Sequence, residues 1–166
     1  MPAKTVEFKY KSAHTIALVD GFANASPALT SDSRLYVIYN TSTNNHVYVG
    51  TADNVKKRFK DRLAACRELG FSGDGLDSIL VFVVQILVND IPAPPHDTGI
   101  SDGIDVEHLL IRTYTAKLGK STRNWSKTAQ FTNGVGGKLS WSLINDCGIQ
   151  SFGGPYSYSL TNGSTF

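Results

Sequence analysis

The chain has 166 residues, of which 41% are hydrophobic and only 18% are charged, and its formal net charge is +2. This composition excludes disorder of the whole chain and favours one compact domain. The N-terminal segment lacks the apolar core of a signal peptide, because it is interrupted by Lys4, Glu7, Lys9 and Lys11. The longest apolar run, 79–88, is about half of the roughly 20 residues that span a membrane. We therefore expect a cytoplasmic protein with no membrane partner.

The first half of the chain contains a clear hairpin pattern. Residues 5–10 could form a short strand or an arm, and 20–33 is a loop rich in Ala, Ser, Asp and Pro. The β-branched and aromatic runs 35–40 and 46–50 are joined by TSTNN, whose paired asparagines tolerate a tight turn. These two runs predict an antiparallel β-hairpin.

The second half alternates between helix and strand patterns. A helix with an outward basic face is expected next, capped by Asp53 or Thr51, and 78–89 is long and apolar enough for a central strand. A second helix should begin at Asp102 or Asp105 and end at Gly119, and a last helix covers 138–147. This order predicts an α+β fold, with a small antiparallel three-stranded sheet flanked by helices and with N- and C-terminal extensions.

The domain boundaries follow from the same reading. Residues 1–33 are expected to form an N-terminal arm, 34–125 the core, and 126–166 a C-terminal extension packed on that core.

The two cysteines have no CxxC or CxxH neighbour, so the pattern predicts neither a zinc site nor a disulfide framework.

Charge is distributed unevenly along the chain. The segment 56–67 holds six cations and one acid, 74–107 holds seven carboxylates and no Lys or Arg, and 108–145 holds six cations and no acid. Two basic segments around an acidic one suit a surface that grips phosphates and also holds a cation. An ordinary solvated surface is the alternative.

The segment RLYVIYNTSTNNHVYVGTADNVKKRF resembles the core motif of GIY-YIG nucleases. Tyr36 stands at the GIY tyrosine, Tyr48 begins YVG in place of YIG, and Arg58 occupies the position of the catalytic arginine. Downstream, DVEHLLIRTY is similar to the helix whose glutamate binds metal, which maps to Glu107. The resemblance covers about 34–125 and implies a GIY-YIG-like nuclease fold.

The resemblance also implies an asparagine after that helix. Asn124 is the candidate and is expected to contact nucleic acid, and Asn133 takes its place if the loop is longer. The outer face of the basic helix adds four residues expected to contact the nucleic-acid backbone, namely Lys56, Lys57, Lys60 and Arg62.

These residue types suit phosphodiester cleavage. A divalent ion, Mg2+ or Mn2+, held by Glu107 and a guanidinium fork from Arg58 would offset the charge that accumulates on the attacked phosphate. Tyr36 would take a proton from the attacking water if nearby positive charge lowers its pKa, and His46 is a backup proton carrier. Individually, each of these residues also suits a structural role in a strand, on a surface or at a helix end.

Two positions differ from the family pattern. Arg34 stands where the family has the glycine of GIY, and Arg62 stands where many members have a histidine or tyrosine that exchanges protons. Arginine stays charged and cannot act as a base, so Arg62 is either a second phosphate clamp or a sign of weakened chemistry.

The predicted function is a metal-dependent endonuclease for nucleic acid, with double-stranded DNA as the expected partner. It would be restriction-like, carried by a mobile element, or delivered as an effector, and its specificity would come from the arms or from a homodimer. The alternative is a non-catalytic nucleic-acid-binding module.

Overall fold

The computed structural model describes residues 3–15, 35–40, 46–53, 79–96, 98–124, 127–147 and 154–166. The helix predicted after Asp53 lies outside these residues. So do six of the residues singled out in the sequence, namely Arg34, Lys56, Lys57, Arg58, Lys60 and Arg62.

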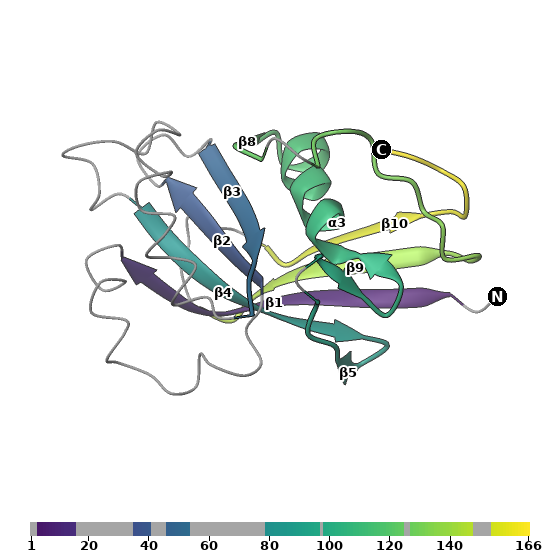
Figure 1. Ribbon diagram of the computed structural model, residues 1–166, viewed down its shortest axis with the longest axis horizontal. Coiled ribbons are helices and arrows are strands. Elements are labelled where there is room, and N and C mark those ends of the chain that lie inside the picture. The colour runs from purple at the N-terminus through teal and green to yellow at the C-terminus, as the bar shows by residue number, and fades with distance from the viewer. Residues whose placement is uncertain are drawn as a thin grey trace.

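One mixed sheet dominates the described fold (Figure 1). Its strands are β1 (Lys4–Thr15), β2 (Leu35–Asn40), β3 (His46–Thr51), β4 (Ile79–Val88), β5 (Ile91–Pro92), β8 (Ser121–Thr122), β9 (Leu139–Asn145) and β10 (Tyr156–Leu160). The strand order is β10-β9-β1-β4-β2-β3-β8, and β5 pairs with β4. The β1–β9 and β3–β8 pairs are parallel, whereas the other pairs are antiparallel.

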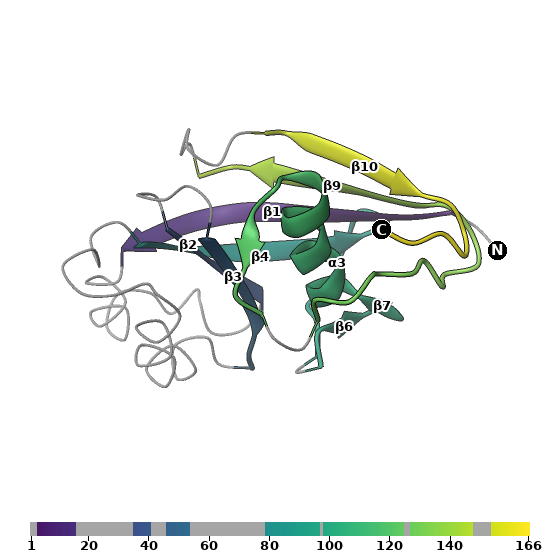
Figure 2. The same cartoon turned by 90° about the horizontal axis from the view of Figure 1, so that it is seen from above.

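Among the described residues, a single helical segment lies in the hollow of this curled sheet (Figures 1 and 2). It consists of α3 (Val106–Arg112) and a π-helical turn, η3 (Thr113–Lys117), and a small ribbon of β6 (Ile100–Ser101) and β7 (Ile104–Asp105) precedes it. No helix in the described part of the chain is long and apolar enough to cross a membrane.

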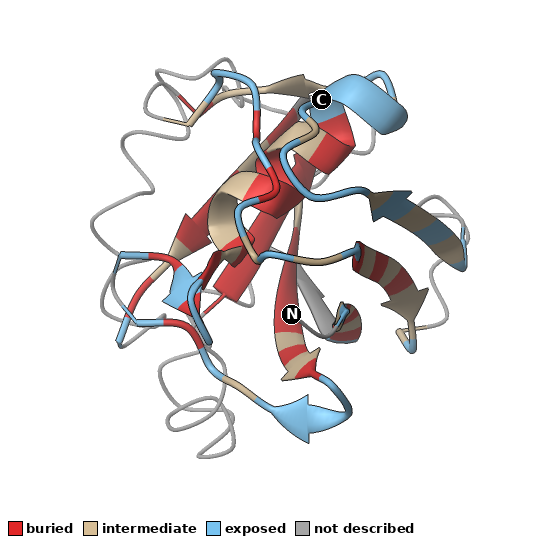
Figure 3. Ribbon diagram, turned by 90° about the vertical axis from the view of Figure 1, so that its right-hand side faces the viewer, coloured by how far each residue is buried: buried red, intermediate tan, exposed pale blue. Residues whose placement is uncertain are grey.

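The core lies between the helical segment and the concave face of the sheet, where Figure 3 shows buried residues on both sides. Two polar contacts fix the helix to this face. Trp141 Nε1 donates a hydrogen bond to Thr113 Oγ1 at 2.9 Å, and the hydroxyls of Tyr10 and Tyr114 lie 3.0 Å apart. Burial raises the pKa of both tyrosines, so this pair stays neutral.

The predicted small three-stranded sheet flanked by helices is wrong. Residues 5–10, for which a short strand was one of two expectations, belong to β1, which lies between β9 and β4, and the expected helix over 138–147 is strand β9. In both segments the apolar residues recur every second position, which is the period of a half-buried strand. They are Val6, Phe8 and Tyr10 in β1 and Leu139, Trp141 and Leu143 in β9.

Three local predictions are confirmed. The hairpin is formed by β2 and β3, in which Tyr36 pairs with Gly50 and Ile38 with Tyr48. The strand predicted over 78–89 is β4, which lies between β1 and β2. The second helix begins at Asp105, whose Oδ1 accepts a hydrogen bond from the backbone N–H of His108 at 2.9 Å.

Candidate functional site

The hairpin brings the two motif tyrosines together. The ring centroids of Tyr36 and Tyr48 lie 6.3 Å apart with an angle of 33° between the planes. Tyr36 is only 1% exposed, whereas Tyr48 is half-buried. Of the two side chains, Tyr48 is therefore the one that a substrate can reach.

Gly50 is required beneath Tyr36. A Cβ atom on Gly50 would lie 2.5 Å from both Cζ and the hydroxyl oxygen of Tyr36, which is closer than real Cβ contacts. The Tyr36 ring thus crosses its partner strand directly over the glycine of YVG. The glycine serves this close approach, since its backbone has no need of an unusual φ.

We expect Gly50→Ala to destabilise the protein by about 1–3 kcal/mol, the usual cost of an added methyl group in a packed site. The reason is that the new methyl group must displace the Tyr36 ring. The free energy of unfolding in urea measures the effect. Gly134→Ala is the matched control, because a Cβ at Gly134 meets nothing within 4 Å, and equal losses in both variants would contradict the proposed contact.

The tyrosine pair lies on the face of the hairpin opposite to α3. Side chains alternate along a strand, and Leu35, Val37 and Tyr39 belong to the core cluster that contains the apolar residues of α3. Tyr36 must therefore point to the other face. A ligand that touches both this pair and α3 has to cross the edge of β3.

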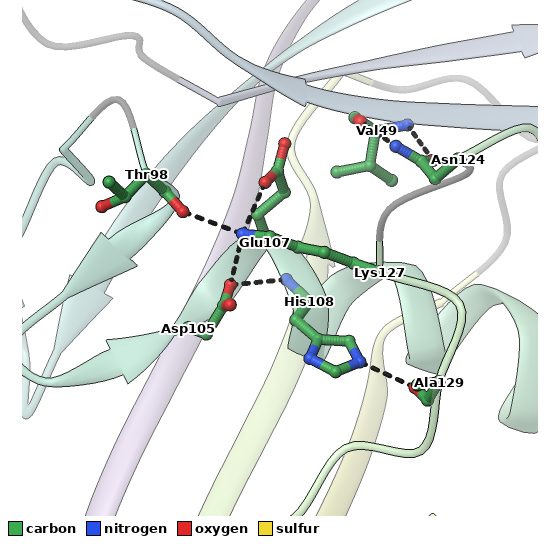
Figure 4. Close-up of polar contacts among 8 residues, drawn as sticks. All are labelled: Val49, Thr98, Asp105, Glu107, His108, Asn124, Lys127 and Ala129. Atoms are coloured by element: carbon green, nitrogen blue, oxygen red, sulfur yellow. Dashed lines mark hydrogen bonds and ion pairs between the residues drawn. The ribbon is translucent and has the colours of Figure 1, made fainter.

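Glu107 lies in the first turn of α3 and forms an ion pair with Lys127 (Figure 4). Lys127 Nζ lies 2.8 Å from Glu107 Oε2, and it donates hydrogen bonds to Asp105 Oδ1 at 3.0 Å and to the carbonyl oxygen of Thr98 at 2.8 Å. We call Thr98, Asp105, Glu107 and Lys127 the lysine cage.

The electrostatics of the lysine cage keep Lys127 charged. Burial acts to lower the pKa of Lys127, but its hydrogen bonds to Glu107 and Asp105 raise it more, so the pKa lies above the usual value. The side chains of Glu107 and Lys127 are only 15% and 20% exposed. Solvent therefore screens this pair less than a surface ion pair.

Gly99 closes one side of the lysine cage. Its φ is +80°, and a Cβ there would lie 2.7 Å from Glu107 Cβ and 2.9 Å from both Glu107 Oε2 and Lys127 Nζ. Any side chain at this position would push the ion pair apart, so the backbone can pass this close only as glycine.

Asn124 is engaged with the backbone of β3. Its side-chain oxygen accepts a hydrogen bond from Val49 N at 3.1 Å, and its amide nitrogen donates to Val49 O at 2.6 Å (Figure 4). Because β8 pairs only with His46 and Val47, the Asn124 side chain continues the hydrogen bonding along the edge of β3. The predicted contact of Asn124 with nucleic acid would have to form beside this role.

The alternative candidate Asn133 and the neighbour of Glu107, His108, also have structural partners. Asn133, the alternative to Asn124, is buried and donates to the carbonyl oxygens of Gly137 and Leu160. His108 Nε2 donates to Ala129 O at 2.7 Å, and its ring packs edge-on against Phe131. Of His46, only the backbone in β3 is described.

A divalent ion at Glu107 would have one carboxylate as its protein ligand, and this carboxylate already pairs with Lys127. Mg2+ commonly uses one or two carboxylates together with water and phosphate oxygens. Figure 4 shows one carboxylate oxygen of Glu107 at Lys127 and the other directed away from it. The described residues contain no group of three or more His, Cys, Asp or Glu that would enclose an ion on its own.

The main feature that the sequence did not reveal is Lys127. It was visible only as one cation of a basic segment, and its pairing with Glu107 follows from the path of the chain between α3 and β9. Comparisons with models of protein families, with curated proteins and with solved structures give no match for this chain.

Proposed function

We propose that the chain is a metal-dependent endonuclease that hydrolyses phosphodiester bonds in nucleic acid, with double-stranded DNA as its expected substrate. The observation that carries this proposal is the tyrosine pair packed across the hairpin, with the Tyr36 ring over Gly50 and the half-buried Tyr48 accessible. The proposal concerns the chemistry of the GIY-YIG motif, because the small sheet expected from that motif is not the fold of this chain.

The tyrosine pair supplies the proton acceptor. Since Tyr36 is 1% exposed, we assign the base to Tyr48 and give Tyr36 the role of positioning the Tyr48 ring. The Tyr48 hydroxyl would take a proton from the water that attacks phosphorus. A tyrosine with a pKa of about 10 needs positive charge nearby for this work.

Positive charge would come from two places. Arg58 would bind two phosphate oxygens through its guanidinium fork, and Glu107 would hold the divalent ion. When bound, the ion stabilises the charge that develops on the phosphate as the bond to the leaving oxygen breaks. The substrate would lie across the edge of β3, since the tyrosines and α3 are on opposite faces of this strand.

Incubation of supercoiled plasmid with the purified protein tests this proposal. Nicked circles should form with Mg2+ or Mn2+ and not with a chelator. Plasmid that stays supercoiled under all three conditions would contradict it.

A non-catalytic nucleic-acid-binding module is the second candidate. It is favoured by one observation, the ion pair that already neutralises Glu107. For such a module, the protein would retard labelled duplex in a gel whether metal is present or not, and it would leave the duplex intact.

A further inference from the structure

We propose that Lys127 competes with the divalent ion for Glu107, so that its ammonium group sets how tightly the protein binds metal. This inference rests on the proposed function, because that proposal assigns the ion to Glu107. Lys127 is then a positioning residue that acts through the carboxylate and touches neither substrate nor metal.

The geometry of the lysine cage supports competition. An ammonium group has three hydrogen atoms to donate, and three oxygens from three parts of the chain lie around Nζ at 2.8, 3.0 and 2.8 Å. They come from the loop before β6, from the N-cap of α3 and from the first turn of α3. Lys127 thus satisfies, with a single positive charge, oxygens of the kind that a hard cation prefers.

The position of Glu107 sets the Lys127 ammonium and a divalent ion in competition for the same carboxylate. Glu107 Oε2 lies 2.8 Å from Nζ and its side chain is 15% exposed, so an ion bound to this carboxylate would lie within a few ångströms of the ammonium. Like charges that close repel strongly where solvent screens them poorly. Metal binding therefore requires Lys127 to withdraw from Glu107, or it proceeds against this repulsion.

A second carboxylate makes withdrawal feasible. Asp105 Oδ1 accepts from both Lys127 Nζ and the backbone N–H of His108. When Lys127 leaves Glu107, it can remain paired with Asp105 while α3 keeps its N-cap. Glu107 can thus bind an ion while the Lys127 ammonium stays paired with Asp105.

The test is Mn2+ binding by the full-length protein, measured by calorimetry in the absence of nucleic acid. We expect Lys127→Met to bind Mn2+ at least about tenfold more tightly than the parent, since one nearby positive charge is removed. Lys127→Arg should stay close to the parent. The double variant Lys127→Met/Glu107→Gln should lose the gain.

Lys9→Met is the matched control. Lys9 also pairs with a carboxylate, Glu7, at 3.8 Å and with similar exposure, but on strand β1. Its Mn2+ affinity should equal that of the parent. A gain in Lys9→Met as large as that in Lys127→Met would show a general effect of net charge and would overturn the competition.

Lys127→Met leaves two carboxylates without their cation and could misfold. A measurement on the parent protein therefore tests the competition without this variant. The side-chain ammonium signal of Lys127 in nitrogen-edited NMR, assigned by its absence in Lys127→Arg, should shift when Mg2+ is added. A signal that does not respond to saturating Mg2+, or a folded Lys127→Met with parental Mn2+ affinity, overturns the proposal.

The outcomes separate this inference from the proposed function. Tighter Mn2+ binding by Lys127→Met without plasmid nicking by the parent would support competition and reject the nuclease. Metal-dependent nicking by the parent, combined with unchanged Mn2+ affinity in Lys127→Met, would reject competition alone.

Discussion

Replacement of Tyr48 by Phe should slow plasmid nicking by about 100- to 10,000-fold, which is the usual contribution of a general base. The change removes one hydroxyl and keeps the ring that packs against Tyr36, so the fold should be little affected. Tyr39→Phe is the control, because Tyr39 lies on the other face of the hairpin within the core. The measurement is the single-turnover rate of nicking with protein in excess.

Tyr36→Phe completes this comparison. Since Tyr36 is buried and contacts Tyr48, its loss should be smaller than that of Tyr48→Phe and larger than that of Tyr39→Phe. A larger loss in Tyr36→Phe than in Tyr48→Phe would return the role of base to Tyr36. Parental rates in all three variants would remove the tyrosines from the mechanism.

Glu107→Gln should reduce nicking by about a thousandfold or more while nucleic-acid binding persists. Loss of a metal ligand removes several kcal/mol of transition-state stabilisation, and each 1.36 kcal/mol corresponds to about a tenfold change in rate. Gel retardation of labelled duplex measures binding, and plasmid nicking measures cleavage. The amide keeps the shape of the carboxylate, so Gly99 and Lys127 can retain their positions around residue 107.

Glu7→Gln is the control for the loss of a carboxylate that pairs with a lysine. It should nick plasmid as fast as the parent. If Glu107→Gln also nicks at the parental rate, Glu107 holds no catalytic ion. In that case the pairing with Lys127 would be its whole role.

The elements predicted correctly have strong local signals. The hairpin is marked by two β-branched runs and a turn, β4 by a long apolar run, and the start of α3 by the capping side chain of Asp105. These signals depend on neighbouring residues only. For the same reason, the contact between Tyr36 and Tyr48 follows once the hairpin is recognised.

The sheet around these elements depends on partners far apart in the chain. β1 pairs in parallel with β9, with Lys4 opposite Leu139. No pattern in the neighbouring residues predicts such a pairing. Leu139, Trp141 and Leu143 alternate with Ser140 and Ser142, which is the period of a strand. The predicted helix over 138–147 did not take this period into account.

The candidate site shows the same division. Glu107 and Asn124 could be selected from the motif, but their partners could not. Lys127 is twenty residues beyond Glu107, at no helical or strand spacing, and Asn124 binds the backbone of Val49, which any residue type would offer. Residue type therefore led only to the proposed chemistry, whereas the pairing of charges required the fold.

The most direct test of the central claim is chelation followed by restoration of metal with the parent protein on supercoiled plasmid. EDTA should stop the formation of nicked circles, and excess Mg2+ added to the same sample should restore the original rate. Nicking that continues in EDTA, or that Mg2+ fails to restore in a protein that is still folded, would contradict a metal-dependent endonuclease.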